Sequence, residues 1–170
     1  MLQLEKWSLV RLIPKKGAIV TTPTPTPTAA EHRDMLDFRA MVEIDAVRSI
    51  AMHDGDTAGV RAGIDDALRR QREAIAMADP LEFASADYAF HAEVIRGGGN
   101  SVVAGILDML APRVVRFTYL AITQPPSRIT ELLDEHSRLG ALALAGESQL
   151  YGDLVHEHIS RGHSAVVVPI

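Results

Sequence analysis

A run of alternating threonine and proline divides the chain into two unequal parts. Residues 21–28 read TTPTPTPT, and repeated proline disrupts both helices and β-ladders, because it fixes φ and has no backbone N–H. We therefore expect an extended linker over 21–29, between a short N-terminal segment (1–20) and one larger domain (30–170). The main hydrophobic core has to be built from the second part.

Beyond the linker, apolar residues recur at helical spacing, with glycine or proline at the interruptions. Only four Phe, three Tyr and one Trp occur among 170 residues, which disfavours an all-β fold. We expect an all-α fold, an antiparallel bundle of six or seven helices, with Asn100 and Ser127 as N-caps. The expected helices are 30–52, 57–78, 80–96, 100–123, 126–145 and 148–162.

The N-terminal segment has the pattern of a β-hairpin. Two extended runs, Leu9–Ile13 and Ala18–Val20, flank the turn 14–17, whose Gly17 supplies the positive φ that such turns often need. An isolated hairpin is marginally stable in water. This one needs a partner, and little sequence upstream could supply it.

The composition excludes several classes of protein. With no cysteine, the chain cannot form a disulfide scaffold, a thiolate zinc finger or a cysteine nucleophile. No apolar run reaches the roughly 18 residues of a membrane span, and no signal peptide is recognisable, so we expect a soluble protein without a membrane partner, with the cytoplasm as the default location. Phosphate-loop, nucleophile-elbow and HExxH motifs are absent, and we expect no catalytic residues.

Four ionisable residues fall on the apolar faces of three expected helices. His136 and His158 lie on the apolar faces of 126–145 and 148–162, and Asp87 and His91 are one turn apart in 80–96. Burying these groups unpaired is costly, and a divalent metal would satisfy all four. Imidazole with carboxylate suits zinc first, then nickel, manganese or iron. The alternative is that the histidines are satisfied core residues and that Asp87 and His91 are an ordinary pair.

Two arginines also fall on apolar faces. Arg113 lies near the middle of the face in 100–123, and Arg39 shares a face of 30–52 with Glu43, four residues on. A buried guanidinium needs an anion. Arg39 could form an internal ion pair or extend to solvent, or either arginine could bind the carboxylate of a small ligand through a bidentate fork.

Several short motifs together resemble a known family. They are RAMVE (39–43), DYAFH (87–91), GGGN ending at Asn100, and EH (135–136) followed 22 positions later by His158. The pattern resembles the effector-binding domain of the FadR branch of GntR-type bacterial transcription regulators, an antiparallel bundle of six or seven helices.

In many members of that family, an Asp and three His hold a divalent metal, and small carboxylates bind above it. The resemblance therefore implies Asp87, His91, His136 and His158 as metal ligands, which are the four that the helical faces select. It also places Arg39 near the effector pocket, whereas Arg113 rests on the helical face alone.

The N-terminal segment resembles another part of these regulators. LVRLIPKKGAIV (9–20) is similar to the final wing of a winged helix-turn-helix, with Lys15 and Lys16 as DNA contacts at its tip. The helices that precede the wing, including most of the recognition helix, are not in these 170 residues. We expect this remnant to bind DNA poorly by itself, whether the chain is a fragment or its start is misassigned.

Taken together, the sequence predicts a metal-dependent sensor of a small organic acid rather than an enzyme. Its ligand state would alter the geometry of a homodimer and of the attached DNA-binding modules. Two alternatives remain. One is a metal-dependent enzyme that acts on a small carboxylate with the same Asp/His site. The other is a helical dimerisation module whose histidines are only core residues.

Overall fold

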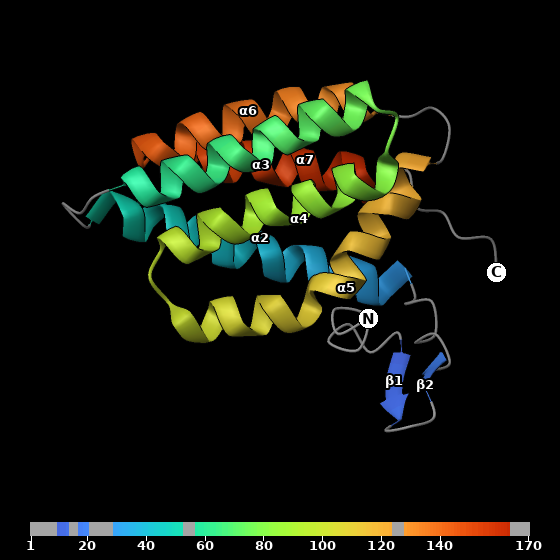
Figure 1. The fold of residues 1–170 in the computed structure, drawn as a ribbon. Coiled ribbons are helices and arrows are strands. Elements are labelled where there is room, and N and C mark those ends of the chain that lie inside the picture. The colour runs from blue at the N-terminus through green and yellow to red at the C-terminus, as the bar shows by residue number, and fades with distance from the viewer. Residues whose placement is uncertain (1–9, 14–16, 21–28, 53–56, 124–127, 164–170) are drawn as a thin grey trace.

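The computed structural model describes residues 10–13, 17–20, 29–52, 57–123 and 128–163. This part of the chain forms two short strands and six helices (Figure 1). The elements are β1 (Val10–Ile13), β2 (Gly17–Val20), α2 (Ala29–Met52), α3 (Ala58–Ala76), α4 (Pro80–Gly97), α5 (Ser101–Thr123), α6 (Ile129–Ala145) and α7 (Ser148–His163). The predicted helical bundle is confirmed.

The ends of the helices follow from local chemistry. Asn100 caps α5 as predicted, because its Oδ1 accepts from the backbone N–H groups of Val102 and Val103, each at 3.2 Å. Asp79 caps α4 in the same way, a role that the sequence analysis did not assign. Gly146 ends α6 with a left-handed φ of 70°, which glycine adopts without strain. Ser127, the other predicted cap, lies outside the described residues.

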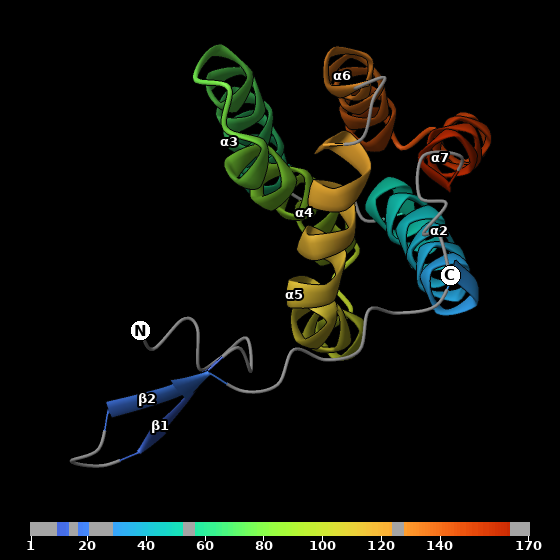
Figure 2. The ribbon, with the colours of Figure 1, turned by 90° about the vertical axis from the view of Figure 1, so that its right-hand side faces the viewer.

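Helix α4 contacts four other helices of the bundle, which are α2, α3, α5 and α6. Helix α7 packs on α2 and α6, and α6 also contacts α3, so that the N-terminal helix and the C-terminal helix lie side by side (Figure 2). The main core includes large side chains that are almost fully buried, among them Ile64, Phe90, Leu139, Tyr151 and Val155. The main core draws residues from five helices, which are α2, α3, α4, α6 and α7.

Helix α5 differs from the prediction in the face that it buries. Its buried residues are Leu107, Val114, Phe117 and Ile122. In the stripe that the sequence predicted around Arg113, only Phe117 is buried; that stripe consists of Val102, Ile106, Leu110, Phe117 and Leu120. At 100° per residue the two stripes are roughly a quarter turn apart. The helix is apolar on more than one side and contains Pro112, and Figure 1 shows its axis changing direction. Periodicity alone therefore selected the wrong face.

Strands β1 and β2 pair in antiparallel register from Val10 with Val20 to Ile13 with Gly17. Gly17 has a φ of 92°. Residues 14–16, which include Lys15 and Lys16, and the predicted linker residues 21–28 lie outside the described residues. The reading of the strand pair as a wing, and the division of the chain into domains, stay predictions.

Among the described residues, no helix has both the length and the apolar character needed to span a membrane.

Candidate metal centre

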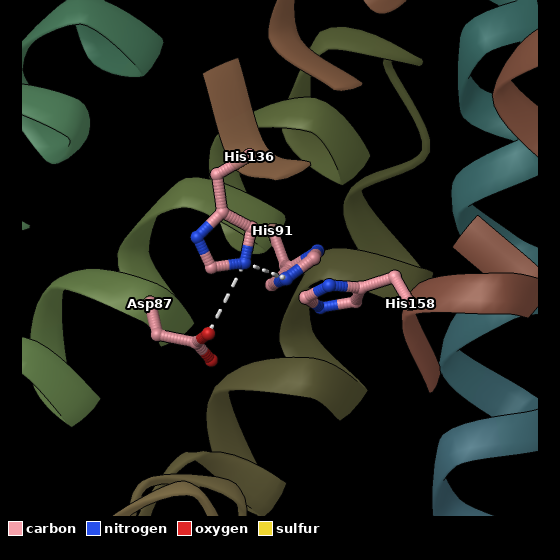
Figure 3. A group of neighbouring side chains, drawn as sticks. All are labelled: Asp87, His91, His136 and His158. Atoms are coloured by element: carbon pink, nitrogen blue, oxygen red, sulfur yellow. Dashed lines mark hydrogen bonds and ion pairs between the residues drawn. The ribbon is translucent and has the colours of Figure 1, made fainter. Parts of the chain in front are cut away.

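Four side chains from three helices meet inside the bundle (Figure 3). Asp87 and His91 come from α4, His136 from α6 and His158 from α7. All four residues are at most 5% exposed. One possible ligand atom from each lies within 4.8 Å of all the others. The structure thus brings together the four residues that the helical faces selected.

The shortest contacts in the cluster surround His136. Its Nε2 atom lies 3.2 Å from Nε2 of His91 and 3.2 Å from Oδ1 of Asp87. Asp87 and His91 share one face of α4 because residues four apart are neighbours on a helix surface. The other carboxylate oxygen of Asp87 accepts a hydrogen bond from the hydroxyl of Thr118 on α5 at 3.2 Å.

The Nδ1 atom of each histidine is engaged by a partner outside the cluster. His91 Nδ1 lies 3.0 Å from Oε2 of Glu43 on α2, and His158 Nδ1 lies 2.7 Å from Oε2 of Glu135 on α6. An ionised carboxylate only accepts, so these two Nδ1 atoms carry the hydrogen. In the neutral rings, each Nε2 atom is then left with a lone pair.

His136 follows the same pattern with an amide as its partner. Its Nδ1 lies 2.9 Å from Oε1 of Gln71, a fully buried residue of α3. The amide nitrogen of Gln71 donates to the carbonyl of Ala86 at 3.4 Å, which leaves Oε1 to accept from His136. Each imidazole is thus oriented by a second bond, the arrangement usual for metal-bound histidine.

The buried carboxylates near the cluster are held in their charged form. Burial alone would raise the pKa of Asp87, but the hydrogen bond and charge of His136, together with His91 and Arg39, keep it well below the ordinary value. For Glu43, the charges of His91 and Arg39 likewise outweigh burial and lower the pKa. For Glu135, His158 and two arginines lower the pKa to about 2 against the effect of burial. All three are therefore anions at neutral pH.

Two of the histidines are held in the neutral form. Burial lowers the pKa of His158 to about 4, although the hydrogen bond to Glu135 opposes the shift. Burial also lowers the pKa of His91, helped by the charge of Arg39 and opposed by Glu43. Neutral imidazole is the form that binds a metal.

This donor set fits a divalent transition metal. Two ligands about 2.1 Å from a tetrahedral zinc ion lie roughly 3.4 Å from each other, and the two closest separations in the cluster are both 3.2 Å. Three imidazoles and one carboxylate are also ligands of the kind that zinc, nickel, manganese and iron accept. Without a metal, Nε2 of His136 can hold Asp87 and His91 only by donating a hydrogen to one of them.

Arg39 lies beside the cluster, buried as predicted, with its Nε 3.0 Å from Oε1 of Glu43. The expected ion pair is therefore present. Neither atom has a well-aligned hydrogen bond, so the contact is mainly electrostatic. The other oxygen of Glu43 accepts from His91 at 3.0 Å and from the Tyr151 hydroxyl at 2.5 Å.

Arg113, the second predicted effector ligand, is exposed and does not line the cavity beside Asp87 and His158. The prediction that it lies on the buried face of α5 is wrong, because that helix turns a different side toward the bundle.

A cavity opens from the cluster toward the N-terminal end of α2. It encloses about 510 Å³ of empty space, part of it open to solvent, and Asp87, His158 and Arg39 lie in its wall. Thr118 and His32 add polar groups, and the other eight lining residues are apolar. The cavity thus has a polar side formed by the cluster and Arg39.

The sequence analysis did not assign roles to Gln71, Glu135, Tyr151 or Thr118. Gln71 carried a usable signal, because it is a polar residue on the apolar face of Ile64, Leu68 and Ala74 in α3. Glu135 precedes His136 directly, but no pattern in the sequence indicates that it would bond His158 on another helix. Thr118 and Tyr151 became recognisable only from the packing.

The chain matches a known domain family over most of its length. Residues 34–161 match the FCD domain. None of the curated proteins matches the sequence.

Solved structures with a similar fold include several bacterial proteins. A GntR transcriptional regulator from Rhodococcus has a TM-score of 0.68 at 17% identity, covering 96% of this chain and 74% of its own. A GntR family regulator from Pseudomonas syringae has a TM-score of 0.61 at 22% identity, and the match covers 97% of this chain and 66% of the regulator. McbR/YncC from E. coli has a TM-score of 0.65 at 15% identity, and the match covers 96% of this chain and 79% of McbR/YncC. At these identities the likeness concerns the fold.

Proposed function

The chain belongs to the FCD domain family, the C-terminal effector-binding domain of GntR-type transcription regulators, and we propose that its Asp/His cluster holds a divalent metal ion beside which a small carboxylate effector binds. Asp87, His91, His136 and His158 are the proposed ligands, with zinc as the first candidate and nickel, manganese or iron as alternatives.

The observation that supports this proposal best is the orientation of the three imidazoles. Each ring directs Nδ1 to a fixed partner outside the cluster, so that all three Nε2 atoms and a carboxylate oxygen converge in one buried space. Without a metal, Nε2 of His136 would have to donate a hydrogen to Asp87 or His91, each 3.2 Å away, whereas a shared cation uses all four atoms as ligands. The pattern favours a shared cation over that alternative.

The proposed role of Arg39 is to hold the carboxylate of the effector. Its side chain lines the cavity together with Asp87 and His158, so a carboxylate there could contact both the guanidinium and the metal. When bound, the metal would supply a Lewis-acidic contact for that carboxylate. Since Arg39 already pairs with Glu43, an effector would share the guanidinium with this buried anion.

Helix α2 connects the proposed effector site with the N-terminal segment. It contains Arg39 and Glu43 and begins at Ala29, directly after the Thr/Pro run. We propose that effector binding shifts this helix in a homodimeric regulator and thereby modulates DNA binding by an attached winged helix-turn-helix. In this account β1 and β2 are the wing, with Lys15 and Lys16 near DNA, and 21–29 is the linker to the sensor domain.

The proposal is tested by thermal denaturation of the protein after removal of metal with a chelator and dialysis. Zinc or nickel at micromolar concentration should raise the melting temperature, because a ligand that binds only the folded state stabilises it. His136→Ala should abolish the rise. No shift with zinc, nickel, manganese or iron, or an equal shift in the variant, would contradict the metal site.

The same metal-loaded protein distinguishes the sensor from the enzyme alternative. Incubation with small carboxylates, followed by chromatography, should show saturable binding and no product. Product formation that depends on the metal would favour the enzyme instead.

A further inference from the structure

We propose that the effector is a monocarboxylic acid with a compact apolar body, and that the cavity discriminates against dicarboxylates. This inference rests on the proposed metal site, because Asp87 and His158 of that site form part of the polar side of the cavity. It names the class of ligand that the cavity would select.

The lining of the cavity is polar on one side only. Asp87 and His158 of the cluster, Arg39 and Thr118 supply hydrogen-bonding groups there, whereas most of the remaining wall is apolar. The apolar wall comes from four helices and includes Met35, Val114, Ile122, Leu132 and Ile159. A carboxylate can be satisfied on the polar side, but a second one on the same molecule would face a wall whose remaining polar side chain is His32, with its ring stacked on Phe117.

The distribution of cationic side chains agrees with this. Among the described residues that line the cavity, Arg39 is the only lysine or arginine. Arg113, which could have held a second carboxylate, is exposed and outside the lining. A dicarboxylate would therefore lack a second guanidinium partner.

One part of the wall is flat. The rings of His32 and Phe117 stack with their centroids 4.1 Å apart and their planes at 24°, and both residues line the cavity. Such a stacked pair offers a planar or edge contact to another ring. The apolar body can therefore be a small ring or a branched alkyl group.

Isothermal titration of the zinc-loaded full chain with four acids tests the inference. Benzoate and isovalerate carry one carboxylate and an apolar body, succinate carries two carboxylates at a similar size, and acetate lacks the body. We expect benzoate or isovalerate to bind at least about tenfold more tightly than succinate and acetate. The inference is overturned if succinate binds as tightly as both, or if none of the monocarboxylates binds to zinc-loaded protein.

A cation added to the apolar wall should reverse part of the preference. Ala121 lines the cavity, and Ala121→Lys is expected to strengthen succinate binding relative to isovalerate, whereas Ala121→Met, of similar length without charge, should not. Equal selectivity in both variants would show that this cavity is not the binding site and would overturn the inference.

Elemental analysis of the titrated sample separates the two proposals. If no zinc is bound after loading, the proposed metal site fails. If zinc is bound stoichiometrically but succinate is preferred, the metal site stands and only the inference about the effector is wrong.

Discussion

His91 and His136 place their Nε2 atoms 3.2 Å apart while the Nδ1 atom of each ring is bonded elsewhere, to Glu43 and to Gln71. At this distance either one Nε2 atom donates a hydrogen to the other, or both lone pairs face a shared cation. The proposed metal site follows from this relationship, since Asp87 and His158 surround the same point.

Replacing His158 should remove metal binding, whereas replacing its neighbour in sequence should not. His158 is buried in the cluster and His156 is exposed. We expect His158→Ala to weaken zinc binding by more than about 100-fold, because one of four ligands is lost, and His156→Ala to leave the affinity within about twofold. Competition with a zinc-sensitive chelating dye measures both. Equal affinities in the two variants would contradict the assignment.

Gln71 should influence metal affinity although it does not touch the metal. Gln71→Leu removes the acceptor for His136 Nδ1 and should weaken zinc binding about 10- to 100-fold by releasing the ring orientation. Gln71→Glu keeps an acceptor and should bind zinc more tightly than the leucine variant. The same dye competition compares the zinc affinities of the three proteins. A Gln71→Leu variant that folds and binds zinc like the wild type would contradict the role of Gln71.

The metal-free protein should lose stability as the pH falls from about 6.5 to 4. The folded-state pKa of His158 is lowered to about 4 from the ordinary 6.5, so between these values the unfolded chain binds a proton that the folded chain does not. Unfolding is then favoured by about 2 kcal/mol at pH 5 relative to pH 7. Urea denaturation with a chelator present measures the change.

His158→Gln serves as the control for this pH dependence, because glutamine can still donate to Glu135 but does not titrate. Its free energy of unfolding should fall less between pH 7 and pH 5 than that of the wild type. Parallel pH profiles for the two proteins would mean that His158 is not responsible.

Two glycines should respond to alanine in opposite directions. A Cβ atom at Gly98 would lie 2.6 Å from Cα of Ala46 in the backbone of α2, whereas one at Gly105 in α5 meets nothing within 4 Å. Gly98→Ala should destabilise the protein by about 1–3 kcal/mol through this clash. Gly105→Ala should stabilise it by about 0.5–1 kcal/mol through helix propensity. Chemical denaturation at neutral pH checks both, and a stabilising Gly98→Ala would contradict the close packing of α2 on α4.

The helices and the ligand set were predictable from the sequence for a physical reason. A polar residue in the middle of an apolar helix face stands out from the 3.6-residue pattern, and this identified His136 and His158. Glycine, proline and asparagine marked the ends of the helices. The predicted ranges agree with the described helices to within a few residues.

The predictions were wrong or incomplete where the packing between helices determines which residues are buried and which are in contact. Helix α5 is apolar on two sides, so its sequence could not show that Arg113 would face solvent. The bond from Glu135 to His158 joins residues 23 apart, and that from Gln71 to His136 joins residues 65 apart. Such contacts depend on how the helices are placed in three dimensions, which helical periodicity does not encode.

The central claim, that three imidazoles and a carboxylate share one cation, is tested most directly by X-ray absorption at the zinc edge on protein loaded with zinc and then dialysed. The account predicts about one zinc per chain, with imidazole scattering from three histidines at about 2.0–2.1 Å that diminishes in His136→Ala. Protein that retains no stoichiometric zinc, or zinc whose spectrum lacks histidine ligands, would contradict it.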